Sequence, residues 1–279
     1  MSGKVDQLSL QLYDSLTQVA TSCGIQFYVV GARARDMILV HGYGREITRA
    51  TMDIDLGIRV SNWDELNKLR DTLLQSKDFT PTKEIQRLLY MEELPVDILP
   101  FGIIEQGDRN ISCPPDHSIV MNVLGFEEAW KVALMVRIRS EPPLYIRCAT
   151  LAGLAVMKLA AWAGRGSERK RDAPDLAYIM HHYMDAGNCE RVLDEHLDLT
   201  QVEDFDYVRA GIRLLGRDMA EILDQNAKAK IIEILERETQ DDGQYQLVQA
   251  MMASGDLTRE SFTEHLKNLE ELKTGIHES

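Results

Sequence analysis

The sequence predicts an α+β domain over residues 1–149, followed by an all-helical domain over residues 150–279. Two observations predict this fold class. Up to about Thr150, short β-branched and apolar segments alternate with helical patterns, and beyond that residue helical periodicity prevails with few strand signals. The length of 279 residues suits one large domain or two ordinary ones, with enough chain to bury a core.

The helices and strands of the first domain follow from periodicity and from glycine positions. Val5, Leu8, Leu12 and Leu16 lie on one face of a helix that Gly24 ends. Ser61 and Asp64 form a capping-box pattern before a further helix. The strands are rich in β-branched and aromatic residues. The predicted helices are 5–23, 32–42 and 63–76, and the predicted strands are 25–30, 53–60, 84–92, 96–104, 133–138 and 144–149.

The second domain carries helical patterns throughout. The segment "LAGLAVMKLAAWAG" is strongly helical and ends at glycines, and Asp172 is the expected N-cap of the helix after it. The predicted helices are 151–164, 172–187, 202–225, 226–239, 244–253 and 258–273.

Charge and composition exclude several functional classes. The formal net charge of −14 disfavours a general nucleic-acid-binding surface, although a local basic pocket could still hold a nucleotide or one RNA end. The four cysteines form no CxxC pair, which indicates free thiols in a reducing compartment. Because the sequence has no signal-peptide core and no run of about 18 apolar residues, we expect a cytoplasmic protein without a membrane span.

Three aspartates on predicted strands form the main candidate site. Asp53 and Asp55 flank Ile54 in "TRATMDIDLGI", so their side chains share one face of a strand, and Asp97 lies in "PVDIL". If the strand of Asp97 neighbours that of Asp55, the three carboxylates converge and require cations. Hard oxygen ligands suit Mg²⁺, and two such ions would clamp a phosphoryl transfer. The alternative for Asp97 is a charge turned to solvent on an edge strand.

The turn in "YVVGARARD" is the second candidate. Gly31 follows a strand and starts a helix, where free N–H groups and close backbone approach suit a phosphate. Arg33 and Arg35 add positive charge at this turn. The alternative is an ordinary strand-to-helix turn with solvated arginines.

Lys158 is the third candidate, because it interrupts an apolar helix face. Leu154, Lys158, Ala161 and Arg165 share one side of this helix. A lysine among apolar neighbours needs an anionic partner. A triphosphate is one such partner, and Asp172 or Asp175 on the next helix is the other, in which case the pair is structural. The upstream aspartates favour a nucleotide contact.

The pattern "VVGARARD … TRATMDIDL … VDIL" resembles the DNA polymerase β-type nucleotidyltransferases, which share an hG[GS] turn, a Dh[DE]h strand and a later h[DE]h strand. The resemblance implies a mixed sheet flanked by helices. It also implies that Asp53 and Asp55 bind the metals, that Asp97 completes the site, and that Gly31 begins the loop cradling the triphosphate. Ala32 stands where this superfamily usually has Gly or Ser.

A second set of residues is similar to the abortive-infection type IV toxin-like (AbiEii-like) nucleotidyltransferases. That group has a KxxAxxxR and RDxxDhxxh signature and an R-x-T-x-D-[IL]-D strand. On this sequence the two patterns fall on Arg49, Thr51, Asp53, Asp55, Lys158, Arg165, Arg171, Asp172 and Asp175. The implied nucleotide contacts are Gly31, Ala32, Arg33, Arg49, Thr51, Lys158, Asp172 and Asp175. The resemblance runs from about residue 25 to residue 183.

Together these patterns predict a magnesium-dependent nucleotidyltransferase that moves a nucleoside monophosphate from an NTP to an acceptor hydroxyl. Asp97 is expected to help activate that hydroxyl. The acceptor could be an RNA or tRNA end, a protein or a small molecule such as an aminoglycoside, and the family implies a possible antitoxin partner. The alternative is a nucleotide-binding regulatory protein that kept the fold and lost transfer, which Ala32 would allow.

Overall fold

The computed structural model describes residues 5–46, 51–114, 119–165, 172–240, 243–252 and 258–279. The chain divides into two compact units, and each is described by itself. A sheet unit comprises residues 1–121 and 130–150, and a helical unit comprises residues 122–129 and 151–279. The segment 122–129, which the sequence placed in the first domain, groups with the helical unit, so the division also falls inside helix α4 (Phe126–Lys131).

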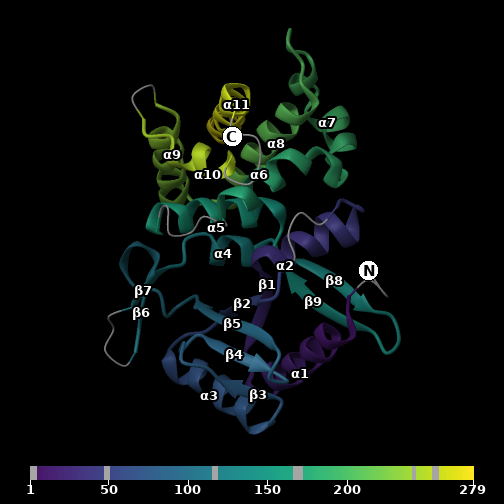
Figure 1. Cartoon of the computed structure of the whole chain (residues 1–279), viewed down its shortest axis with the longest axis vertical. Helices are drawn as coiled ribbons and strands as arrows, with labels where there is room; N and C mark the ends of the chain where they lie inside the picture. Colours follow the sequence, from purple (N-terminus) through teal and green to yellow (C-terminus); the bar gives the residue numbers. More distant parts are fainter. Residues whose placement is uncertain (1–4, 47–50, 115–118, 166–171, 241–242, 253–257) are drawn as a thin grey trace. The chain divides into compact units, whose positions relative to one another are not determined.

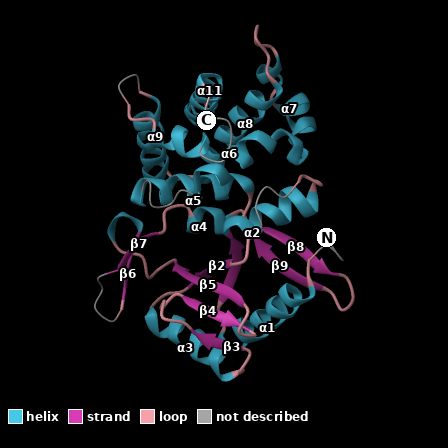
Figure 2. Cartoon of the chain, in the orientation of Figure 1, coloured by secondary structure: helices cyan, strands magenta, loops and turns pink. Residues whose placement is uncertain are grey.

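The sheet unit is built on a seven-stranded mixed sheet in the order β3-β4-β5-β2-β1-β9-β8 (Figures 1 and 2). Strands β1 and β2 are antiparallel, whereas β2 and β5 are parallel, as are β1 and β9. The strands of this sheet are β1 (Gln26–Val30), β2 (Ile54–Arg59), β3 (Phe79–Pro81), β4 (Arg87–Tyr90), β5 (Leu94–Phe101), β8 (Leu134–Arg139) and β9 (Leu144–Cys148).

Helices α1 (Gln7–Cys23) and α3 (Trp63–Gln75) of the sheet unit contact each other (Figure 1). Leu12 of α1 and Leu73 of α3 are fully buried. The N-cap of α3 is Asn62, whose Oδ1 accepts a hydrogen bond from the Glu65 N–H at 3.0 Å, so the capping box predicted from Ser61 is wrong by one residue. Ser61 instead donates its own N–H to the Glu65 carboxylate.

The segment after β1 is helical, as predicted, but not uniformly α-helical. Helix α2 (Gly31–Asp36) continues into a π-helix, η1 (Met37–Gly42), whose first three residues are buried. Strand β3 and a separate two-stranded sheet, β6 (Asn110–Cys113) and β7 (Ile119–Asn122), were not predicted. Strands of three or four residues show too little alternation to be recognised in a sequence.

From Leu151 onward the described residues form helices and no strand (Figure 2). The sheet flanked by helices, together with this helical part, confirms the predicted α+β fold. The helices are α5 (Leu151–Arg165), α6 (Asp172–His182), η4 (Met184–Asn188), α7 (Cys189–Glu195), η5 (Leu197–Thr200), α8 (Tyr207–Ile222), α9 (Gln225–Thr239), α10 (Gln246–Met252) and α11 (Arg259–His277). None of the helices in the described ranges is long and apolar enough to cross a membrane.

The last helix, α11, extends beyond the predicted end at residue 273 because Ile276 is fully buried. Helices α8 and α11 approach closely where two glycines face each other. A Cβ on Gly216 would lie 2.3 Å from the carbonyl oxygen of Leu272, and one on Gly275 would lie 2.0 Å from that of Arg213. Glycine at both positions therefore sets the short distance between these helix backbones.

Candidate active site

Four strands of the sheet place one row of residues side by side. Asp97 on β5 lies opposite Asp55 on β2, Asp55 lies opposite Val30 on β1, and Arg87 on β4 lies opposite Asp97. Residues paired in register point to the same face of a sheet. The sequence-predicted aspartates Asp55 and Asp97 are thus neighbours, and an arginine that was not predicted adjoins them.

Gly31 follows this row directly, after Val30. Its φ is +64°, a left-handed conformation that glycine adopts without strain. A Cβ at this position would lie 2.1 Å from Oδ2 of Asp55. The glycine turn and the Asp55 strand therefore meet, and the missing side chain makes the space for the carboxylate.

Asp97 is held by Arg87 on the neighbouring strand. The guanidinium donates from Nε to Oδ1 and from Nη2 to Oδ2 of Asp97, both at 2.7 Å. Arg87 Nη2 also lies 3.8 Å from Oδ2 of Asp53. The hydrogen bonds to Asp97 raise the pKa of Arg87, although partial burial opposes the shift, so the guanidinium remains charged.

The three aspartates supply the donor type that Mg²⁺ prefers, namely carboxylate oxygens on one face. Within the described residues, however, no group of three or more His, Cys, Asp or Glu side chains could hold a metal ion as it stands. Both oxygens of Asp97 instead accept hydrogen bonds from Arg87. The donor set fits the ion in chemistry, with Arg87 as the cation that now pairs with Asp97.

Two of the predicted nucleotide contacts in the sheet unit carry buried polar atoms without a partner. Nε of Arg33 and Oγ1 of Thr51 form no hydrogen bond within the part of the chain that the structure describes. Such orphaned groups are rare in folded proteins and are often completed by a ligand. Arg35, by contrast, is 1% exposed and pairs with Asp36 at 2.7 Å, so it is not a solvated arginine.

Ala32 and Arg49 complete this set. Ala32 is buried at 5% exposure directly after Gly31, so it can offer only its backbone. Arg49 lies outside the described residues.

The hydroxyl of Tyr13, on α1, is a further orphan that the sequence did not suggest. The side chain is fully buried, and its oxygen forms no hydrogen bond with any described residue. Burial raises the pKa of Tyr13, while the positive charge of Arg33 opposes that shift. Tyr13 adjoins the apolar stripe used to predict the helix, and nothing in its spacing distinguishes it from a core residue.

In the helical unit, Lys158 lies between two aspartates of α6. Its ammonium donates to Asp172 Oδ1 at 2.7 Å and to Asp175 Oδ2 at 2.8 Å. All three side chains are at least 87% buried, with exposures of 13%, 10% and 4%. Burial alone would lower the pKa of Lys158, but the two carboxylates outweigh it and raise that pKa. The structure thus brings the three residues together and provides the structural partners that the sequence offered as the alternative to a triphosphate.

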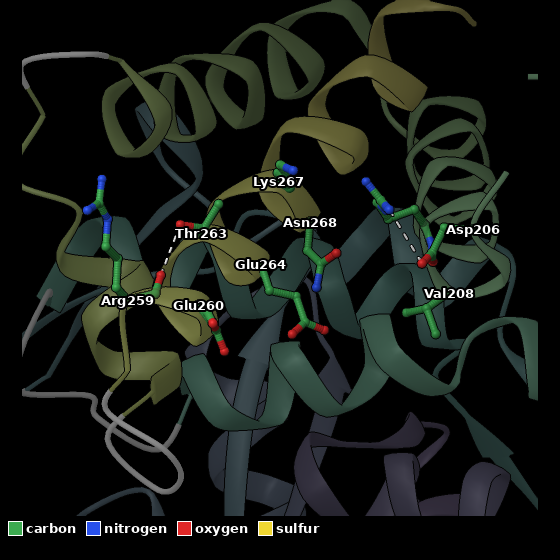
Figure 3. Close-up of a pocket in the computed structure, with 9 residues that line it drawn as sticks. Asp206, Val208, Arg259, Glu260, Thr263, Glu264, Lys267 and Asn268 are labelled. Carbon is green, nitrogen blue, oxygen red and sulfur yellow. Dashed lines mark hydrogen bonds and ion pairs between the residues drawn. The ribbon is translucent and has the colours of Figure 1, made fainter. Parts of the chain in front are cut away.

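The helical unit also has an open pocket of about 550 Å³ along α11 and the start of α8 (Figure 3). None of the predicted site residues lines it. Its charged lining is balanced, with three basic and three acidic side chains: Arg209, Arg259, Lys267, Asp206, Glu260 and Glu264. A balanced lining does not favour a triphosphate over other ligands.

Comparison with known proteins identifies related sequences and folds. The family described as "Nucleotidyl transferase AbiEii toxin, Type IV TA system" matches residues 21–268. No curated protein matches the chain. Among solved structures, the antibiotic-resistance factor ANT(2'')-Ia is 12% identical, with a TM-score of 0.40, and the match covers 70% of this chain and 93% of that one.

Two CCA-adding enzyme structures are similar at greater length. The apo form II is 12% identical with a TM-score of 0.33, over 94% of this chain and 71% of that chain. The Thermotoga maritima enzyme complexed with tRNA is 14% identical with a TM-score of 0.27, over 94% of this chain and 70% of that chain.

Proposed function

The chain belongs to the AbiEii family of nucleotidyltransferase toxins of type IV toxin–antitoxin systems, and from this membership we propose that it is a magnesium-dependent enzyme that transfers a nucleoside monophosphate from an NTP to an acceptor hydroxyl. The observation that carries the proposal is the row in which Asp55 and Asp97 stand in register beside Gly31. Pyrophosphate is the leaving group of such an in-line displacement.

The aspartates have distinct roles in this proposal. Asp53 and Asp55 would hold Mg²⁺, with Asp97 completing a two-ion site, and the bound ions would supply charge stabilisation for the attacking and leaving oxygens. Asp97 would also accept the proton of the acceptor hydroxyl. Both of its oxygens accept from Arg87, and pairing with this cation makes the carboxylate a weaker base, so release of Arg87 would favour the proton transfer.

The triphosphate would bind at the turn after β1. The backbone of Gly31 and Ala32 and the side chains of Arg33, Arg49 and Thr51 are the proposed contacts. The unpartnered Nε of Arg33 and Oγ1 of Thr51, among the described residues, support this placement because phosphate oxygens would satisfy both.

We include Lys158, Asp172 and Asp175 as nucleotide contacts of the helical unit. Two carboxylates against one ammonium leave this group negatively charged, so it suits a hydroxyl or amino group of the nucleotide better than a phosphate. The ammonium of Lys158 has three donors, and the two aspartates take two of them.

Three classes of acceptor are to be separated by experiment: an RNA end, a protein hydroxyl and a small molecule. The net charge of −14 favours a cationic small molecule or a protein over a long nucleic acid. Family membership also suggests an antitoxin partner.

The test is to incubate the protein with each α-labelled NTP, Mg²⁺ and cell extract, and then to separate RNA, protein and small molecules. We expect label in one fraction, and its loss in Asp55→Asn with the fold intact by circular dichroism. Asp64→Asn, which changes an exposed aspartate of α3, is the matched control and should transfer normally. Normal transfer by Asp55→Asn would refute the site.

Ala32 favours a second candidate, a nucleotide-binding protein without transfer activity. It stands where the polymerase β-type enzymes usually have Gly or Ser, and its buried methyl group cannot donate to a phosphate. Metal-dependent NTP binding with no labelled product in any fraction would favour this candidate.

A further inference from the structure

The contacts of Arg87 place a positively charged side chain beside the carboxylates of the proposed metal site. Its guanidinium forms two charge-assisted hydrogen bonds with Asp97 and lies 3.8 Å from Asp53. A divalent ion that used Asp97 would meet this positive charge at close range. Guanidinium and metal ion are therefore competitors for one carboxylate.

Arg87 has room and a partner for leaving Asp97. Its side chain is 30% exposed, whereas Asp97 is 13% exposed, so the arginine can move while the aspartate is held in the sheet. Glu84 lies 3.5 Å from Arg87 Nε, and its side chain is 55% exposed. Glu84 can keep the guanidinium paired near the surface once Asp97 is released.

A triphosphate is the ligand best suited to take over the guanidinium. The planar fork of arginine binds carboxylate and phosphate oxygens in the same bidentate manner, so the exchange conserves charge-assisted hydrogen bonds. Asp97 would then have both oxygens available for an ion.

We propose that Arg87 is a displaceable counter-ion, which occupies Asp97 in the empty site and passes to the nucleotide phosphates when an NTP binds. The inference rests on the proposed function and deepens it, because it makes completion of the ion site depend on nucleotide. Nucleotide and the ion at Asp97 then bind with positive coupling, which is reciprocal by thermodynamic linkage.

The experiment measures two affinities in Arg87→Gln, namely that for Mn²⁺ without nucleotide, by electron paramagnetic resonance, and that for a non-hydrolysable NTP analogue at saturating Mg²⁺. We expect Mn²⁺ affinity to rise about tenfold, because one adjacent positive charge is removed at a partly exposed site. We expect affinity for the analogue to fall about tenfold, because a charged hydrogen-bonding partner of the phosphates is lost. A structural role alone would lower both affinities or leave both unchanged.

Further variants make the result specific. In Asp97→Asn, adding Arg87→Gln should raise Mn²⁺ affinity by much less than in wild type, because the contested carboxylate is gone and only the charge of Arg87 near Asp53 is removed. Arg137→Gln removes an exposed arginine of β8 and should change neither affinity. Arg87→Lys keeps the charge but cannot form the bidentate pair, and it should show smaller shifts in the same directions if Arg87→Gln does not fold.

The Asp55→Asn variant distinguishes a failure of the proposed metal site from a failure of the counter-ion role of Arg87. If it leaves Mn²⁺ affinity unchanged, the metal site fails and the counter-ion role fails with it. If Asp55→Asn abolishes Mn²⁺ binding but Arg87→Gln moves the two affinities together or not at all, the counter-ion role alone is overturned.

Discussion

The carboxylate of Asp55 lies so close to Gly31 that a Cβ on residue 31 would stand 2.1 Å from Oδ2. The two sequence motifs that suggested a nucleotide site, the glycine turn and the aspartate strand, are therefore one packed unit. Because Gly31 carries a hydrogen in place of a side chain, the Asp55 carboxylate can occupy this space. A larger residue at position 31 should consequently displace the carboxylate of Asp55.

Gly31→Ala should destabilise the protein and disable the site. The left-handed φ of +64° costs a non-glycine residue about 1–2 kcal/mol, and the clash with Asp55 adds about 1–3 kcal/mol of overpacking. Because the carboxylate must move, transfer activity should fall about 100-fold. Urea unfolding and the labelled-NTP assay measure the two effects.

Gly24→Ala is the matched control for that substitution. Gly24 has a φ of +71°, but a Cβ there would meet nothing within 4 Å. The Gly24→Ala variant should lose only the roughly 1–2 kcal/mol of stability that the left-handed conformation costs alanine, and it should keep full activity. Equal losses of stability and activity in the two variants would show that the contact with Asp55 has no consequence.

Much of the fold could be predicted because its signals are local. The strands of Asp55 and Asp97 are apolar runs bounded by turns, and the helix of Lys158 is strongly periodic. From the sequence, Asp55 and Asp97 were expected to converge on one face only if their strands were neighbours. The neighbour relation itself is a tertiary property, and the structure supplies it.

Arg87 could not be placed because its position depends on hairpin register. The sequence predicted a turn at Glu92 and Glu93. A hairpin centred between these two residues would pair Leu88 with Asp97. In the structure Met91 and Glu92 have positive φ values, and the ladder is centred on Glu92, so that Arg87 faces Asp97. A shift of one residue exchanges the two faces of a strand, and local propensity does not resolve it.

Lys158→Met should destabilise the helical unit by about 3–5 kcal/mol, since it leaves the buried carboxylates of Asp172 and Asp175 without their cation. Denaturant unfolding at neutral pH measures the loss. The triple variant with Asp172→Asn and Asp175→Asn should recover much of it. A loss below about 0.5 kcal/mol would show that the ion pairs contribute as little as exposed ones.

The pH dependence of Lys158 has a defined sign. Its pKa is raised above the usual 10.5, so its contribution to stability is fully present below pH 10.5 and is lost as the pH rises through the higher folded value. The difference in unfolding free energy between wild type and Lys158→Met should thus be constant from neutral pH up to about pH 10 and shrink above it. A difference that grew with pH would contradict the assignment.

Tyr13→Phe should leave stability unchanged or raise it by about 1 kcal/mol, because it removes a buried hydroxyl that has no partner in the described structure. Tyr183→Phe is the contrasting variant. Its hydroxyl donates to the buried carboxylate of Asp218, and its loss should cost about 1.5–3 kcal/mol. Thermal unfolding of the two variants side by side tests both, and a Tyr13→Phe protein as unstable as Tyr183→Phe would mean that the Tyr13 hydroxyl is paired.

Gly275→Ala tests the close approach of α8 and α11. The new Cβ would lie 2.0 Å from the backbone oxygen of Arg213 and 3.1 Å from Cα of Gly216, and neither backbone can turn aside as a flexible side chain would. The helices must separate, which should cost about 1–3 kcal/mol or more.

Gly164→Ala in α5 is the control, since a Cβ there meets nothing within 4 Å. It should gain up to about 1 kcal/mol from the better helix propensity of alanine. Chemical unfolding of both variants gives the comparison, and a gain in Gly275→Ala like that in the control would mean that the two helices are not packed backbone to backbone.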